Sequence, residues 1–274
     1  GMVCVPTFEV EDTIKAIDQH RITQINGSDE MFARLLDARP KPDPFPTVDF
    51  CGFANFTPSL DNIVSRADRQ GLKLVGLYGA SEIFAFFAAQ YPDDTVDARN
   101  RMGGFPVSNL TKVRVRDPKN GNLLKTGHVG ELEFQTPSLM LQYFNNTEAT
   151  ASAITSDGFF RSGDLGLVCA DGSFQFLSRI GDMLRLGGFL VNPQEIEAYI
   201  QQHIDVEECQ VIGVDGPRGT RPVGFVILRE NATTLETDLT NHCLAGMAKF
   251  KVPYRIFPVS DFPTTTGANG TKIQ

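Results

Sequence analysis

Helical and strand-like hydrophobic patterns alternate over the first third of the chain. Apolar residues repeat at helical spacing in several segments, and short continuous apolar runs separate these segments. Ser28 precedes two acidic residues, so its hydroxyl is suited to cap the free amide groups at the start of a helix. Strands that alternate with helices predict a parallel sheet with right-handed crossovers. The predicted helices cover residues 10–20, 28–38 and 58–70 and a segment from 81, and the predicted strands cover 22–25, 47–51 and 72–77.

The hydrophobic pattern changes after residue 103 and again after Arg179. The middle region holds short runs rich in Val, Leu and Phe, separated by turn residues, which predicts an antiparallel sheet or small barrel. The last region begins with a hairpin interrupted by glycines and continues with mixed helices and strands. Strands are predicted at 112–115, 130–135, 166–169 and 173–177, then a hairpin at 183–191, helices from 193 and over 235–250, and strands at 210–214, 222–228 and 254–259.

These patterns predict a fold of the class α/β plus α+β. A parallel α/β arrangement is predicted to about residue 102 and an antiparallel sheet over 103–178. A small α+β domain is predicted over residues 183–274.

Composition excludes several kinds of partner. The 274 residues carry a formal net charge of -8, so the basic surface typical of nucleic-acid or anionic-membrane binding is not expected. No apolar run approaches the roughly 20 residues that span a bilayer. The five cysteines are scattered and include no C-x-x-C pair, which argues against a disulfide framework or a zinc site and favours a cytoplasmic location. A homo-oligomer remains compatible with the sequence.

The run Tyr78-Gly79-Ala80-Ser81-Glu82 carries candidate chemistry at the end of a predicted buried strand. A glycine in this place is usually only a tight turn. Its neighbours add more: the tyrosine offers an aromatic face to a base, and the hydroxyl and carboxylate can meet a phosphate-bound metal ion. A helix starting at Ser81 would also favour an anion at its N-terminus.

Two later runs add polar groups. The run from Asp157 to Gly166 contains Asp164, whose carboxylate offers two acceptor oxygens. The run from Ser178 to Asp182 contains Arg179, which taken alone would be an ordinary surface arginine. In that run Gly181 allows wide backbone rotation.

Together and in this order, these runs resemble the motifs of AMP-forming acyl-activating enzymes, in particular acyl-CoA synthetases. The resemblance implies that Tyr78 stacks on adenine, Ser81 contacts phosphate and Glu82 holds Mg²⁺. It also implies that Asp164 binds both ribose hydroxyls and that Arg179 reaches the ribose and phosphate of ATP or AMP. It further implies that residues 1–178 are the remaining part of a large N-terminal domain whose parallel α/β subdomain is incomplete. Residues 179–182, with Gly181, would then be the hinge, and residues 183–274 the small, mobile C-terminal domain.

Further matches to the family supply the remaining candidate residues. Cys51-Gly52-Phe53-Ala54 resembles the family's adenine loop, which implies nucleotide contacts for Gly52, Phe53 and Ala54, together with Gly79. Gly187 and Gly188 match the glycines that line the passage for coenzyme A. Lys272 matches the catalytic lysine that bridges carboxylate and α-phosphate, although Gly-Thr-Lys stands where the family has Thr-Gly-Lys.

The resemblance implies an ATP-dependent ligase that joins a carboxylic acid, most simply a fatty acid, to coenzyme A through an acyl-adenylate. It covers almost the whole chain but only about the last half of a usual family member. The family's Ser/Thr/Gly-rich phosphate loop has no match here, so the isolated chain is expected to be inactive. Two alternatives remain: an amino-acid or aryl-acid adenylating domain of a carrier-protein system, and a non-catalytic nucleotide-binding or scaffold relative.

Overall fold

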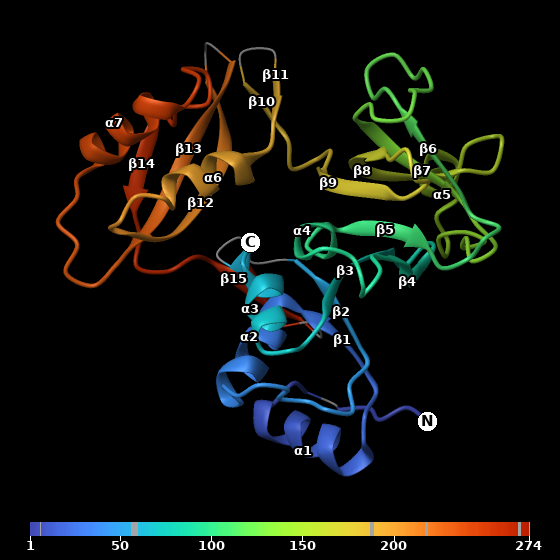
Figure 1. The fold of residues 1–274 in the computed structure, drawn as a ribbon. Coiled ribbons are helices and arrows are strands. Elements are labelled where there is room, and N and C mark those ends of the chain that lie inside the picture. Colours follow the sequence, from blue (N-terminus) through green and yellow to red (C-terminus); the bar gives the residue numbers. More distant parts are fainter. Residues whose placement is uncertain (6, 56–59, 187–188, 217–218, 268–269, 274) are drawn as a thin grey trace. The chain divides into compact units, whose positions relative to one another are not determined.

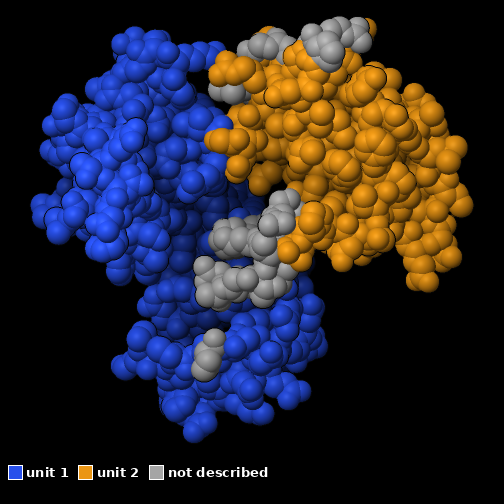
Figure 2. All heavy atoms as spheres, turned by 180° about the vertical axis from the view of Figure 1, so that it is seen from behind, with its two compact units in different colours: residues 1–180 blue, residues 181–274 orange. Residues whose placement is uncertain are grey.

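The computed structural model describes residues 1–5, 7–55, 60–186, 189–216, 219–267 and 270–273; the side chains of residues 190 and 265–273 lie outside this description. The chain divides into two compact units, Gly1–Ile180 and Gly181–Gln274, coloured separately in Figure 2. The boundary between them lies within the predicted hinge, residues 179–182.

The first unit begins with a parallel α/β arrangement, as the sequence predicts. Three parallel strands follow one another in the sheet, and the helices between them pack on it through a cluster that contains Phe32, Leu36, Phe53, Ile63 and Leu74. Ser28 caps the second helix, since its hydroxyl accepts a hydrogen bond from the Met31 amide. The elements are α1 (Val10–His20), β1 (Gln24–Ser28), α2 (Asp29–Ala38), β2 (Phe50–Ala54), α3 (Ile63–Arg69) and β3 (Leu74–Ala80).

The helix predicted from Ser81 is wrong. The chain turns at residues 81–83 and returns as β4 (Phe84–Ala89), antiparallel to β3. The segment is rich in phenylalanine, which favours strands, and Phe87 and Ala88 are buried. Gly79 permits the tight return, because a Cβ there would lie 2.1 Å from the Ala85 carbonyl oxygen.

Antiparallel strands complete the first unit. They extend the parallel strands into one nine-stranded sheet in the order β1-β2-β3-β4-β5-β9-β8-β7-β6 (Figure 1). In the described part of the chain this sheet is open, so of the two predicted forms the antiparallel sheet is found. A second core cluster is formed by side chains of these strands and includes Tyr78, Phe87, Phe134 and Phe174. The elements are α4 (Val96–Arg99), β5 (Gly103–Pro106), β6 (Lys112–Arg116), β7 (Gly130–Gln135), α5 (Thr147–Ala153), β8 (Phe160–Val168) and β9 (Phe174–Arg179).

The second unit is a small α+β domain with its own core. Its central strand β13 pairs antiparallel with β12 and parallel with β14, and two helices pack on the sheet through a cluster that includes Ile196, Val226 and Leu239. Asn192 caps α6 by accepting a hydrogen bond from the Gln194 amide. The elements are β10 (Leu184–Leu186), β11 (Phe189–Val191), α6 (Pro193–Ile200), β12 (Val206–Gly216), β13 (Gly219–Leu228), α7 (Glu236–Gly246), β14 (Arg255–Pro258), β15 (Thr264–Gly267) and β16 (Gly270–Ile273). None of the described helices is long and apolar enough to cross a membrane.

Candidate functional site

A buried tyrosine–carboxylate pair joins β3 to β8. The Tyr78 hydroxyl donates a hydrogen bond of 2.6 Å to Oδ2 of Asp164, and both side chains are buried. Burial, followed by the charge of Asp164, raises the pKa of Tyr78 well above its usual range. The phenol therefore keeps its proton and acts as a fixed donor to the carboxylate that the sequence assigns to ribose.

The ring of Tyr78 packs inside the core. Its centroid lies 5.2 Å from that of Phe174 and 5.4 Å from that of Phe134, and only 7% of the residue is exposed. The stacking of this ring on adenine therefore stays a prediction. It requires the ring to become more exposed than it is in this structure.

Arg179 supplies a cation to the other oxygen of the same carboxylate. Its Nε lies 3.3 Å from Oδ1 of Asp164, and the two residues face each other across the β8–β9 pairing. The Arg179 side chain is 63% exposed, whereas that of Asp164 is 7% exposed. The structure thus brings together three residues that lie in three separate sequence motifs.

A second tyrosine–carboxylate pair lies at the turn after β3. The Tyr143 hydroxyl donates a hydrogen bond of 2.7 Å to Oε1 of Glu82. Burial, then the bond to Glu82 and its charge, raises the pKa of Tyr143, and the positive charge of Arg179 opposes this rise. Tyr143 is not among the site residues predicted from the sequence. The nearby Ser81 is exposed, so its hydroxyl is accessible to a ligand.

The protein groups around Glu82 suit a metal ion that arrives with a ligand. Among the described residues there is no group of three or more His, Cys, Asp or Glu side chains that could hold a metal ion alone. Mg²⁺ is commonly bound by one or two carboxylates together with substrate phosphates. A single, partly exposed carboxylate such as Glu82 fits that arrangement.

The predicted adenine loop is part of a strand. Gly52, Phe53 and Ala54 lie in β2, and the Phe53 side chain is fully buried in the core. A Cβ on Gly52 would lie 2.5 Å from Cδ1 of Leu77, so glycine avoids a clash with a side chain of the neighbouring strand. A contact of Phe53 with a nucleotide could come only from its backbone.

The remaining candidates belong to the second unit. Gly181 lies in a turn, where a Cβ would meet nothing within 4 Å. Gly187 and Gly188 lie outside the described residues. Lys272 is part of β16, paired with Thr265, and its side chain is outside the described part of the chain. The roles of these four residues in the hinge, the passage for coenzyme A and catalysis stay predictions.

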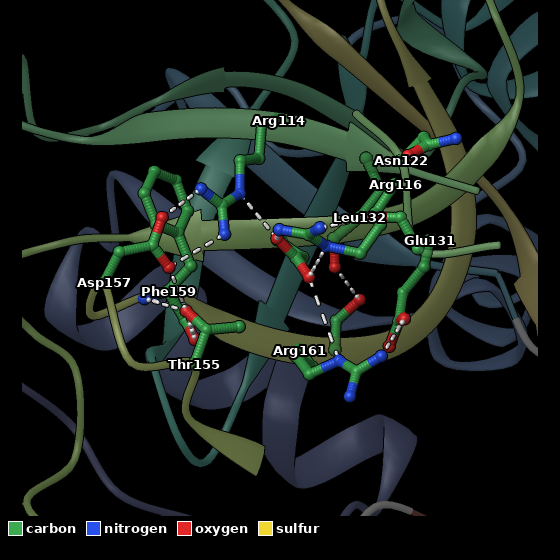
Figure 3. Close-up of polar contacts among 12 residues, drawn as sticks. Arg114, Arg116, Asn122, Glu131, Leu132, Thr155, Asp157, Phe159 and Arg161 are labelled. Carbon is green, nitrogen blue, oxygen red and sulfur yellow. Dashed lines mark hydrogen bonds and ion pairs between the residues drawn. The ribbon is translucent and has the colours of Figure 1, made fainter. Parts of the chain in front are cut away.

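A charge network around the buried Glu133 supports the strand that carries Asp164, and it was not predicted from the sequence. Glu133 on β7 has no exposed side-chain surface, and its carboxylate accepts hydrogen bonds from Nε of Arg114 at 2.5 Å and from Nε of Arg116 at 2.7 Å. Arg114 also forms two hydrogen bonds to Asp157, which Figure 3 shows. The network therefore ties β6 and β7 to the loop before β8.

Glu131 connects this network to Asp164. Its carboxylate accepts a hydrogen bond of 3.3 Å from the Gly163 amide and lies 3.5 Å from a guanidinium nitrogen of Arg161. Ser162 adds a further bond, because its hydroxyl accepts from the Asp164 amide and donates to the Leu132 carbonyl. The backbone on the N-terminal side of Asp164 is thus held from β7.

Comparison with known proteins identifies the family. The model of the family described as AMP-binding enzyme matches residues 1–144, and that of the AMP-binding enzyme C-terminal domain matches residues 195–268. The chain belongs to the AMP-binding enzyme family of adenylate-forming ligases. This confirms the resemblance on which the site residues were chosen.

Similar proteins are acid–CoA ligases by name. A putative acyl–CoA ligase of Bacillus subtilis, YdaB, is 30% identical over 88% of this chain and 47% of its own length, and the mitochondrial medium-chain acyl-CoA ligase ACSF2 of Bos taurus is 27% identical over 100% and 45%. The structure of ATP-bound MatB from Rhodopseudomonas palustris superimposes with a TM-score of 0.85 at 26% identity, over 100% of this chain and 53% of that one. The chain spans about half the length of the curated relatives it matches.

Proposed function

We propose that this chain is part of an ATP-dependent acid–CoA ligase. The whole enzyme would convert a carboxylic acid and ATP into an acyl-adenylate and pyrophosphate, and then transfer the acyl group to the thiol of coenzyme A. The observation that carries this proposal is the position of Asp164, held between the Tyr78 hydroxyl and Arg179. The names of several relatives, which are acyl-CoA and 4-coumarate–CoA ligases, support the class of reaction.

The adenosine end of the nucleotide is assigned to Asp164 and Arg179. A carboxylate has about four acceptor positions, so Asp164 can bind ribose hydroxyls while it keeps the bond from Tyr78. Arg179, which is mostly exposed, is free to move toward the α-phosphate. A guanidinium suits this role because its planar donors match phosphate oxygens.

The phosphate end is assigned to Ser81 and Glu82. A Mg²⁺ ion bound there would neutralise charge on the phosphates during adenylate formation. Lys272 is assigned to stabilise the charge that develops between carboxylate and α-phosphate, and Gly181 to the rotation that brings Gly187 and Gly188 to the coenzyme A passage. Catalysis by such a site is mostly positioning and charge stabilisation.

A fatty acid is the substrate that we favour, with an aryl or amino acid as the alternative. The relatives' names support both kinds of acid, since they include medium-chain acyl-CoA and 4-coumarate–CoA ligases. The sequence has no match to the family's Ser/Thr/Gly-rich phosphate loop, so the chain alone should release little pyrophosphate from ATP in the presence of a fatty acid.

Binding of a non-hydrolysable acyl-adenylate analogue tests the assigned site. We expect saturable binding in calorimetry by the unchanged chain and its loss in Asp164→Ala. Asp93→Ala is the matched control, because Asp93 is an exposed aspartate that pairs only with Lys73 among the described residues. Equal binding by all three proteins would refute the assignment of Asp164, and no binding by the folded, unchanged chain would refute a nucleotide site in this part of the enzyme.

A further inference from the structure

We infer that Tyr143 is a positioning residue for Glu82: its hydroxyl fixes one carboxylate oxygen so that the other is presented to the metal ion of a metal–nucleotide complex. This inference rests on the proposed function, which assigns Glu82 to the metal. Among the described residues, the hydrogen bond of 2.7 Å from Tyr143 is the one side-chain bond to this carboxylate.

The main chain around Tyr143 is anchored to the first turn of α5. The Tyr143 amide donates to Oγ1 of Thr150 at 3.0 Å, and the Thr150 hydroxyl itself donates to the Asn146 carbonyl at 2.8 Å. The Asn146 side chain caps α5 by accepting from the Ala149 amide at 3.0 Å. A cap of this kind fixes the path by which the chain enters the helix. The position of the tyrosine is therefore set by the start of α5.

The segment before Tyr143 is anchored to the turn that carries Glu82. The Met140 amide donates to the Glu82 carbonyl at 2.7 Å, and the Ser138 hydroxyl donates to the Ile83 carbonyl at 2.7 Å. Two backbone anchors and the side-chain bond thus hold residues 138–143 along the same turn. This arrangement holds the Tyr143 hydroxyl against one oxygen of the Glu82 carboxylate, which fixes that oxygen.

Such a fixed carboxylate has a direct consequence for metal binding. Carboxylates that bind metals are commonly held by hydrogen bonds from neighbouring groups, and removal of such a partner weakens metal binding about 10–100-fold. The phenol donates to the carboxylate through its hydroxyl and carries no charge, so it does not compete with the metal ion as lysine or arginine would.

Tyr143 also lies beside the segment that leads to Asp164. It lines an open depression of about 500 Å³ together with Arg161, Ser162 and Gly163, the three residues that precede Asp164. The residue that positions the metal carboxylate therefore borders the segment that positions the ribose carboxylate. Both lie in the first unit, so this arrangement does not depend on the second.

The test compares metal-free and metal-dependent nucleotide binding by the whole chain. Mn²⁺ replaces Mg²⁺, so that bound metal is followed by electron paramagnetic resonance, and the affinities for AMP without metal and for ATP with Mn²⁺ are measured by calorimetry. In Tyr143→Phe we expect the gain in ATP affinity that Mn²⁺ provides to fall about 10–100-fold, with metal-free AMP binding unchanged. Tyr91→Phe, at a residue that is 55% exposed, should change neither.

A double-mutant cycle separates positioning from a general structural effect. If Tyr143 acts through Glu82, Glu82→Gln alone removes the Mn²⁺-dependent gain, and adding Tyr143→Phe causes no further loss. Tyr78→Phe should alter AMP binding and leave the Mn²⁺-dependent gain in place, because Tyr78 contacts Asp164.

Two outcomes would overturn the inference, and they differ in whether they also overturn the proposed function. Normal AMP binding with an unchanged Mn²⁺-dependent gain in Tyr143→Phe would overturn the role of Tyr143 and leave the proposed function intact. An unchanged chain that binds neither AMP nor Mn²⁺–ATP would overturn both.

Discussion

Glu197 should make the stability of the second unit depend on pH. This glutamate of α6 is 4% exposed, and its Oε1 accepts a hydrogen bond of 2.8 Å from the Val211 amide. Burial raises its pKa from 4.5 to about 7, and the Val211 bond only partly opposes this rise. In the unfolded chain the carboxyl loses its proton near 4.5, whereas in the folded unit it keeps the proton until about pH 7.

The sign and size of the effect follow from these two pKa values. Between them the unfolded state releases a proton that the folded state retains, so the free energy of unfolding falls as pH rises. At about 1.4 kcal/mol per pKa unit, the difference between 4.5 and about 7 corresponds to about 3 kcal/mol. Below the lower value and above the higher one, Glu197 contributes no further change.

Glu197→Gln should remove this dependence. The amide oxygen of glutamine can still accept from the Val211 amide, but the side chain cannot ionise. We expect equal stability of the two proteins near pH 4.5 and an advantage of up to about 3 kcal/mol for the variant at about pH 8. Urea unfolding followed by circular dichroism gives the free energies, because the chain has no tryptophan, and hydrogen exchange of α6 and β12 peptides assigns the effect to this unit.

Glu195→Gln is the matched control on the same helix. The Glu195 side chain is 58% exposed and pairs with Lys251, so its replacement should shift stability by no more than about 0.5 kcal/mol at either pH. Unfolding free energies of the unchanged chain and Glu197→Gln that run parallel from about pH 4.5 to about pH 8 would refute the argument.

Two further substitutions test the packing of the first unit. Gly79→Ala should destabilise it by about 3 kcal/mol or more and lower the melting temperature, because the new Cβ would lie 2.1 Å from the Ala85 carbonyl oxygen. Gly181→Ala is the control: its new Cβ meets nothing within 4 Å, so the melting temperature should not change. Similar melting temperatures for the two variants would contradict the close approach of β3 and β4. Glu133→Gln should lower the free energy of urea unfolding by about 3 kcal/mol, because Arg114 and Arg116 lose a fully buried carboxylate. Glu148→Gln, at an exposed residue, is its control. Equal stability of the two variants would rule out a stabilising role for Glu133.

Features that depend on neighbouring residues in the sequence could be predicted. The starts of α2 and α6 are examples, since Ser28 and Asn192 each bond an amide within three residues. Strand ends were less accurate, because they depend on the partner strand: β2 begins at Phe50 and not at Thr47. The error after Gly79 has the same origin. Residues 84–89 are strand because they return along β3, and that pairing involves contacts that no local pattern contains.

The residues of the candidate site could be predicted from the sequence, but the hydrogen bonds among them could not. Tyr78, Asp164 and Arg179 could be assembled only because their motifs stand in a family order, and the hydroxyl bond from Tyr78 to Asp164 had no signal in the sequence. The charge network around Glu133 did have a signal in the sequence. Arg114 and Arg116 are two residues apart on β6, and Glu131 and Glu133 are two residues apart on the neighbouring β7. Residues two apart on a strand share one face of the sheet. Opposite charges at that spacing predict cross-strand pairs.

The contacts of Asp164 with Tyr78 and Arg179 also indicate which of these two side chains can move when a ligand arrives. The bond from Tyr78 leaves acceptor positions on both oxygens, because each carboxylate oxygen has two lone pairs. The tyrosine is therefore compatible with a bound ribose and does not need to leave. Arg179 faces the other oxygen at 3.3 Å with a side chain that is 63% exposed, so of these two neighbours it is the one with room to move. A ligand that reaches Asp164 can therefore retain Tyr78, and any movement that it requires of these two side chains falls to Arg179.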